Sequence, residues 1–166
     1  SLMPNNIYGP GDNFDLATSH ALPALIRKFY EAQFYKKTSV TIWGTGKPKR
    51  EFLHVDDLAS AAIFCYESVE ASDLQKNQIS HINIGTSRDI SIQDLAVMIQ
   101  EISGFEGEID HDLGKPDGMQ RKLLDSNKIL SLGWQSSIPL ELGLRDVYNH
   151  YCETALPADW INGGSS

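Results

Sequence analysis

The 166-residue sequence has little of three things, and each shortage excludes a class of protein. No apolar run approaches the roughly 20 residues that cross a membrane as a helix, so a helical membrane protein is not expected. Lys and Arg number 14 against 22 Asp and Glu, and the formal net charge is −8. This balance argues against nucleic acid as the main partner, because phosphate backbones are bound by a basic surface. A local cationic pocket for a small anionic ligand fits better.

Cysteine is scarce as well, with Cys65 and Cys152 as the two, both in predicted helices. They are interpreted as small buried residues in a reducing compartment, so a cytoplasmic protein is expected. The five histidines are scattered without the spacing of metal ligands, so no metal site is predicted. The composition, 41% apolar and 22% charged, is that of one globular domain with a core.

The most informative stretch is W-G-T-G-K-P-K-R-E-F-L-H-V-D-D-L, residues 43–58. Polar and apolar residues alternate over Ser39–Trp43, and the segment is rich in β-branched residues, which predicts a strand. The turn after it is rich in Gly and Pro and carries three cations, Lys47, Lys49 and Arg50. Residues 51–55 are predicted to be extended, and a helix is predicted to open at Asp56-Asp57. An aromatic side chain, free backbone N–H groups and clustered cations suit an aromatic base and a phosphate. A solvated hairpin is the alternative.

The rest of the chain alternates between helical and extended patterns. Helical periodicity predicts longer helices over residues 21–35, 55–69, 91–103 and 137–153, and a short one over 126–132. Strands are predicted at 81–85, returning into a parallel sheet, and at 108–112, with a polar loop over 70–80. Residues 1–160 are therefore expected to form one α/β unit, in which 1–18 is the loop after a strand. Residues 161–166 are expected to be a tail or linker.

Three motifs keep a common order and spacing. They are S-H-x-x-P-A-L-I-R from Ser19, W-G-T-G-x-P-x-R-E-F-L-H-V-D-D from Trp43, and K-P-D-G-x-x-R-K-L-L-D from Lys115. Together they resemble extended short-chain dehydrogenase/reductase enzymes that act on nucleotide sugars, in the variant of the GDP-L-fucose synthase family. The resemblance covers residues 4–151. It implies the C-terminal part of an NAD(P)-binding Rossmann-type α/β fold, mainly the smaller substrate-binding domain, with strands that return to the parallel sheet.

The resemblance also implies roles for individual residues. His20 matches the family's general acid, which protonates enolate intermediates, and a helix N-terminus depresses the pKa of a nearby imidazole. The nicotinamide end of NADP(H) is expected to lie against His20 and the segment Pro4, Asn5, Asn6 and Ile7. Asn6 is expected to approach the sugar-nucleotide phosphates. Further substrate contacts are expected at Lys28, Trp43, Arg50, Asp117 and Lys122.

Two parts of the family's chemistry are missing from this sequence. It has no glycine-rich dinucleotide fingerprint after an N-terminal strand, and no Tyr is followed four residues later by Lys. Hydride transfer needs a cofactor held against the sugar. The chain alone is therefore expected to be inactive, with NADP(H) bound mainly by an upstream half.

For the longer enzyme, the resemblance implies a homodimer that converts GDP-4-keto-6-deoxy-D-mannose to GDP-L-fucose. The conversion combines epimerisation at C3 and C5 with reduction by NADPH. Two alternatives stay open. One is another nucleotide-sugar epimerase or dehydratase of the same superfamily, and the other is a nucleotide-sugar binding module without catalysis.

Overall fold

The computed structural model describes residues 1–76, 78 and 80–155. Its strands are β1 (Leu2–Pro4), β2 (Asn6–Tyr8), β3 (Ser39–Trp43), β4 (Lys49–Arg50), β5 (Phe52–His54), β6 (Ile82–Ile84), β7 (Ile90–Ser91), β8 (Glu108–Asp112) and β9 (Arg121–Lys122). Its helices are α1 (Ala21–Phe34), α2 (Val55–Ser68), α3 (Ala71–Lys76), α4 (Ile92–Ser103), α5 (Asn127–Leu132) and α6 (Leu140–Thr154). None of the helices within these ranges has the length and apolarity needed to cross a membrane.

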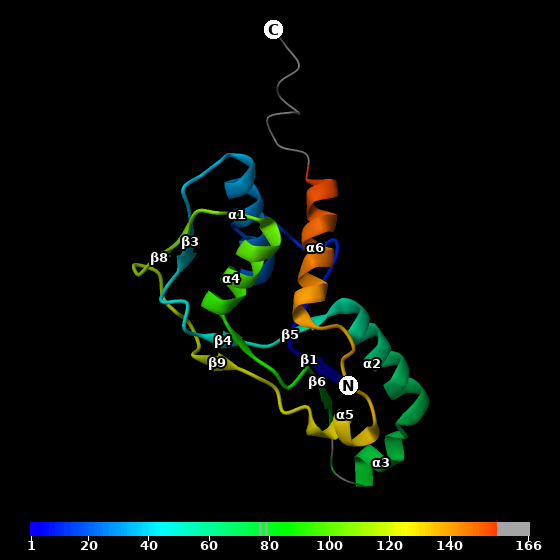
Figure 1. Ribbon diagram of the computed structural model, residues 1–166. Coiled ribbons are helices and arrows are strands. Elements are labelled where there is room, and N and C mark those ends of the chain that lie inside the picture. The colour runs from blue at the N-terminus through cyan, green and yellow to red at the C-terminus, as the bar shows by residue number, and fades with distance from the viewer. Residues whose placement is uncertain (77, 79, 156–166) are drawn as a thin grey trace.

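The strands are short and mostly pair in parallel with strands distant in sequence. β1 pairs with β6, β2 with β5 and β3 with β8, all in parallel. β4 lies between β7, which is antiparallel to it, and β9, which is parallel. In Figure 1, β4 and β9 lie between the β3–β8 pair and the β1–β6 pair. Parallel pairs need long crossovers, here through helices, so the expected α/β class and the return of residues 82–84 into parallel pairing are confirmed.

Two apolar cores hold these elements together. The first is formed mainly by α1, α4 and α6 against β3. The residues that recur at helical spacing along α1 are buried in it: Leu22, Leu25, Ile26, Phe29 and Ala32. The three helices lie side by side in Figure 1. The second core lies where α2 and α5 cover β5 and β6, and it is built from Leu53, Ala61, Cys65, Ile82, Ile84, Ile129 and Trp134. Elements that carry site residues are therefore anchored in two separate cores.

Local capping signals explain some helix ends. At the start of α4, the Asp94 N–H donates to Ser91 Oγ at 3.0 Å, and Ser91 Oγ donates to Asp94 Oδ2 at 2.6 Å. Gly104 ends this helix in the left-handed region at φ 69°. His20 is the N-cap residue of α1, and the hydroxyl of the preceding Ser19 is buried without a partner among the described residues.

Tertiary contacts correct several boundaries. α6 begins at Leu140 and not at 137, because the Asp57 carboxylate binds the N–H groups of Ser137 and Ile138 at 2.9 and 3.1 Å. The same contact turns Asp57 inward, so α2 buries Asp57, Ala61 and Cys65, whereas the neighbouring Ala62 is exposed.

Other expectations differ from the structure in smaller ways. The polar loop expected over 70–80 contains α3, and the loop expected over 1–18 contains β1 and β2. Cys65 is buried as predicted, but Cys152 is exposed, because it lies off the buried face of α6. The expected tail at 161–166 lies outside the described residues.

Glu51 lies at the junction of these elements with a fully buried carboxylate. Its Oε2 accepts hydrogen bonds from Asn5 Nδ2 at 2.6 Å and from the Leu124 N–H at 3.1 Å. Its Oε1 accepts from the Ser87 N–H at 2.7 Å and from Thr86 Oγ1 at 3.4 Å. Burying a carboxylate is unfavourable unless donors satisfy it, and here they come from three distant segments. Glu51 thus joins the ends of β1, β6 and β9.

We expect Glu51→Ala to lower the free energy of unfolding by about 3–5 kcal/mol. The substitution leaves several buried donors unsatisfied, at about 1–3 kcal/mol each. Urea denaturation followed by circular dichroism measures the loss. Glu106→Ala, at an exposed position, is the matched control and should change stability by less than about 0.5 kcal/mol. A loss as small in Glu51→Ala as in the control would contradict this role.

Candidate functional site

Trp43 ends β3 with an exposed indole ring that lies between two cations. Its side chain is 60% exposed, and the ammonium groups of Lys28 and Lys115 lie 5.8 and 5.1 Å from the ring centroid. The Lys28 ammonium also donates to the Thr41 carbonyl oxygen at 2.8 Å. Burial lowers the pKa of Lys28, and the charge of Asp112 partly opposes that shift. The arrangement offers a flat aromatic surface with positive charge beside it.

The turn after Trp43 is bound to the loop that carries Lys115. The Asp117 carboxylate accepts hydrogen bonds from the Thr45 N–H at 2.6 Å and from Thr45 Oγ1 at 2.8 Å. Gly44 has φ 68°, and a Cβ there would lie 2.2 Å from Asp117 Oδ1, so this position requires glycine on both grounds. At the other end of the loop, the Asp112 carbonyl accepts from the N–H groups of Gly44 and Lys115 at 2.9 and 3.1 Å. Lys115 is therefore held near Trp43 from both sides.

Arg50 and Lys122 are neighbours on the strands that continue from this turn. They are register partners in the parallel β4–β9 pair. Arg50 Nη1 donates to the Lys49 and Met119 carbonyl oxygens at 2.8 and 2.7 Å, which fixes the guanidinium against the same loop. Asn6 lies alongside, since its Nδ2 donates to the Glu51 carbonyl oxygen at 2.7 Å.

The structure thus links six of the predicted residues through adjacent elements: Asn6, Lys28, Trp43, Arg50, Asp117 and Lys122. We call Trp43 together with four cations, Lys28, Lys115, Arg50 and Lys122, the Trp43 surface. Lys115 was not singled out from the sequence. Its motif, K-P-D-G, carries a strong turn signal, but nothing local indicates that the loop lies over an aromatic ring 72 positions earlier.

The remaining predicted residues are placed differently. His20 is exposed at the N-terminus of α1, and its side chain has no hydrogen bond to another described residue. Pro4 is exposed, whereas the side chain of Ile7 packs against the second core. Asn5 is buried on Glu51, and its Oδ1 is a buried acceptor without a partner in the described part of the chain. Their proposed roles stay predictions.

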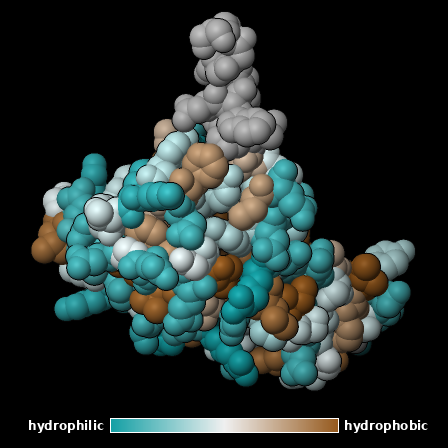
Figure 2. All heavy atoms as spheres, turned by 45° about the horizontal axis from the view of Figure 1, so that its top comes forward, coloured by the Kyte–Doolittle hydropathy of each residue, from teal (hydrophilic) through white to brown (hydrophobic). Residues whose placement is uncertain are grey.

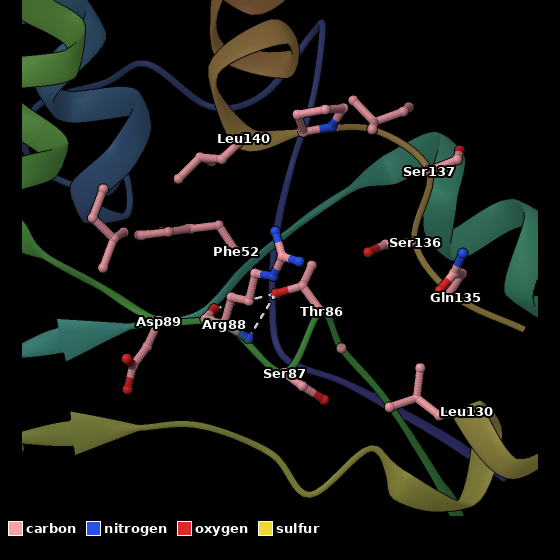
Figure 3. A pocket seen from close by; sticks show the side chains of 14 residues that line it. Phe52, Thr86, Ser87, Arg88, Asp89, Leu130, Gln135, Ser136, Ser137 and Leu140 are labelled. Carbon is pink, nitrogen blue, oxygen red and sulfur yellow. Dashed lines mark hydrogen bonds between the residues drawn. The ribbon is translucent and has the colours of Figure 1, made fainter.

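A groove of about 660 Å³ opens beyond β6, and no predicted site residue lines it. One wall is the loop 85–90 and the other is the segment 135–140, with Phe52 and Leu130 between them (Figure 3). We call this space the β6 groove. Ligands in α/β proteins bind at the carboxyl ends of parallel strands, which is where this groove lies. Sequence periodicity gives no signal for it, because both walls are irregular segments.

The outer surface is mixed in character. Figure 2 shows hydrophilic side chains over most of one face, with hydrophobic side chains in separate patches. Among the large apolar side chains that are exposed, Leu113 and Met119 flank the loop that carries Lys115, at 72% and 66%. Over residues 1–76, 78 and 80–155, no group of three His, Cys, Asp or Glu residues could hold a metal ion.

Parallel strand pairs joined through helices, with an aromatic and cationic surface beside them, are features of α/β nucleotide-binding proteins. The chain belongs to the NAD dependent epimerase/dehydratase family, whose family profile matches residues 1–85. The resemblance to nucleotide-sugar enzymes inferred from the three motifs is thereby confirmed.

Individual relatives agree with this assignment. The probable GDP-L-fucose synthase 1 of Oryza sativa subsp. japonica is 46% identical over 158 residues, which are 95% of this chain and 46% of that protein. A GDP-6-OMe-4-keto-L-xylo-heptose reductase from C. jejuni has a TM-score of 0.83 at 39% identity, covering 93% of this chain and 53% of the other. A GDP-L-fucose synthetase from Naegleria fowleri bound to NADP has a TM-score of 0.79 at 30% identity, covering 92% and 46%. The chain spans about half the length of these proteins.

We expect the contact between Asp117 and Thr45 to depend on pH. The hydrogen bonds from the Thr45 N–H and hydroxyl, with the nearby charge of Lys47, hold the pKa of Asp117 below its ordinary value of 3.8. The contact is therefore complete at neutral pH and is lost as the pH falls through this lowered pKa. The Thr45 amide resonance in a ¹⁵N NMR titration reports it, and Asp117→Asn should abolish the transition. A Thr45 resonance that shifts equally in both proteins would contradict the contact.

Proposed function

We propose that this chain is the nucleotide-sugar-binding part of an enzyme that converts GDP-4-keto-6-deoxy-D-mannose to GDP-L-fucose. The conversion is an epimerisation at C3 and C5 followed by reduction with NADPH. The observation that carries the proposal is the Trp43 surface, where an exposed indole between two lysines lies next to the Arg50–Lys122 strand pair. The relatives' printed names support the choice of a GDP-sugar.

In this proposal the ligand makes two kinds of contact, one through its base and one through its diphosphate. A guanine base can stack on the exposed Trp43 ring, because every base has a flat face and the ring is accessible. The diphosphate then lies toward Arg50 and Lys122, which supply a forked guanidinium and an ammonium. The net charge of −8 repels an anion at long range, so these local contacts must hold it.

The chemical step in this proposal needs the longer enzyme and its cofactor. NADPH, when bound, supplies the hydride for reduction at C4. His20, exposed at the start of α1, is the proposed proton donor during epimerisation. Asn5 Oδ1, a buried acceptor without a partner among the described residues, is suited to receive an N–H of the nicotinamide carboxamide. The proposal includes a cytoplasmic homodimer for that enzyme.

Two other functions use the same surface. Another nucleotide-sugar epimerase or dehydratase would show a preference for a different base, such as that of a UDP-sugar. A binding module without catalysis would bind the GDP-sugar and have no upstream half. Titration with GDP, UDP and ADP distinguishes our proposal from an enzyme that prefers another base. Sequencing the region that encodes the upstream residues distinguishes it from a binding module without catalysis.

We expect Arg50→Ala to weaken GDP binding by about ten-fold to a few hundred-fold. Charge-assisted hydrogen bonds contribute roughly 1.5–3 kcal/mol each, and a ten-fold change in affinity corresponds to about 1.4 kcal/mol. Arg50→Lys should recover part of the loss, because an ammonium keeps the charge and loses the fork. Calorimetric titration of GDP into each variant gives the dissociation constants.

Arg145→Ala is the matched control for Arg50→Ala. Arg145 lies on α6 in an ion pair with Glu141 at 2.9 Å, away from the Trp43 surface, so its loss should leave GDP binding unchanged. Equal dissociation constants in wild type and in Arg50→Ala, with folding intact, would remove Arg50 from the site. Failure of wild type to bind GDP would overturn the proposed function itself.

Lys115 is expected to favour guanine over adenine. A base stacked on Trp43 brings its edge within reach of the Lys115 ammonium, and guanine offers the O6 and N7 acceptors where adenine has an amino group. We expect wild type to bind GDP about ten-fold more tightly than ADP, and Lys115→Met to reduce this ratio to about two. Lys128→Met, at an exposed position on α5, is the control. An unchanged ratio in Lys115→Met would exclude the contact with the base.

A further inference from the structure

The β6 groove has the dimensions and the stiffness of a ligand site. Its volume of about 660 Å³ lies within the roughly 300–1,000 Å³ of small-molecule pockets. Each wall is held by a different buried carboxylate. Glu51 binds Ser87 and Thr86 of the first wall, and Asp57 binds Ser137 and Ile138 of the second. The groove is therefore shaped by the interior of the protein before any ligand arrives.

The walls present donors that the protein itself does not use. Arg88 is the one arginine in the described part of the chain whose guanidinium has no hydrogen bond or ion pair; the others bind Glu31, Met119, Asp89 and Glu141. Figure 3 shows Arg88 extending into the space between the walls. Asp89, the carboxylate beside it, is already paired with Arg121. The hydroxyls of Ser87 and Ser136 likewise have no partner among these residues.

Apolar side chains from several elements also line the groove. Phe52, Ile90, Leu130, Ile138 and Leu140 contribute to it. Ser87 has φ 58°, a left-handed conformation that few residues other than glycine adopt, and Glu51 stabilises it through the Ser87 N–H. A strained residue held by a buried group at the wall of a groove is a common feature of binding sites.

We propose that the β6 groove binds a phosphorylated small molecule, with Arg88 as the residue that contacts the phosphate. The guanidinium forks onto two phosphate oxygens. The free Ser136 hydroxyl on the opposite wall suits the third oxygen, which a carboxylate lacks. The body of the ligand lies on the apolar lining. The groove shares no residue with the Trp43 surface, so this inference does not depend on the proposed function.

Phenyl phosphate, which combines a phosphate with an apolar body, is the probe that tests this assignment. ¹⁵N NMR titration of the 166-residue chain should shift the amides of Ser87–Asp89 and of 135–138. Arg88→Ala should weaken binding by about ten-fold or more, and Arg88→Lys by less, because the charge remains. Arg145→Ala, with its guanidinium on α6, should bind as wild type does. Inorganic phosphate should bind more weakly than phenyl phosphate, and benzyl alcohol should cause no shift.

Three results would overturn the assignment. Equal affinity in wild type and Arg88→Ala would exclude Arg88, and benzoate bound as tightly as phenyl phosphate would exclude a preference for phosphate. Shifts confined to the amides of the Trp43 surface would exclude the groove. Measurements of GDP binding in Arg50→Ala and Arg88→Ala test the proposed function only. Measurements of phenyl phosphate binding test the β6 groove only, so one proposal can fail while the other holds.

Discussion

The buried carboxylate of Glu51 is the constraint on which the rest of the structure depends. A charge removed from water must receive hydrogen bonds, and Glu51 receives them from Asn5, Ser87 and Leu124, which belong to three different segments. These segments follow β1, β6 and β9, so one side chain fixes the edge from which the functional loops leave. The strands themselves are two to five residues long and could not do this by pairing alone.

Two other carboxylates also accept hydrogen bonds from the backbone of irregular segments. Asp57 binds the backbone before α6, and Asp117 binds the turn after Trp43. In each case an acidic side chain satisfies N–H groups that no strand or helix satisfies, which is the requirement that irregular backbone imposes. The acidic composition thus has a structural use within an α/β fold of short strands. The loops that carry Lys115 and Arg88 are both positioned this way.

The chain belongs to the NAD dependent epimerase/dehydratase family and spans about half the length of its relatives. The described residues bring together an aromatic ring, three lysines and an arginine beside one turn, which suits recognition of a nucleotide diphosphate. His20 lies at the N-terminus of α1, the same helix that carries Lys28 of the Trp43 surface.

Local sequence patterns determined much of the fold. The periodicity of residues 21–35 and 91–103 predicted α1 and α4, which are observed over Ala21–Phe34 and Ile92–Ser103. Residues 39–50 predicted a strand ending at Trp43 and a turn after it, and both are observed. Such a strand and turn form from the local preferences of β-branched residues and glycine.

The remaining features depend on contacts between residues that are far apart in the sequence. Glu51 is bonded by Ser87 and Leu124, 36 and 73 positions away, and Asp57 by Ser137, 80 positions away. These contacts bury carboxylates that a sequence pattern places in solvent, and Asp57 joins Ala61 and Cys65 on the buried face of α2. They also hold the two irregular segments that form the β6 groove. The contact of Asp117 with Thr45 likewise holds Lys115 near Trp43. Periodicity reports how each element contacts its surroundings, but it carries no information about which distant N–H group needs an acceptor.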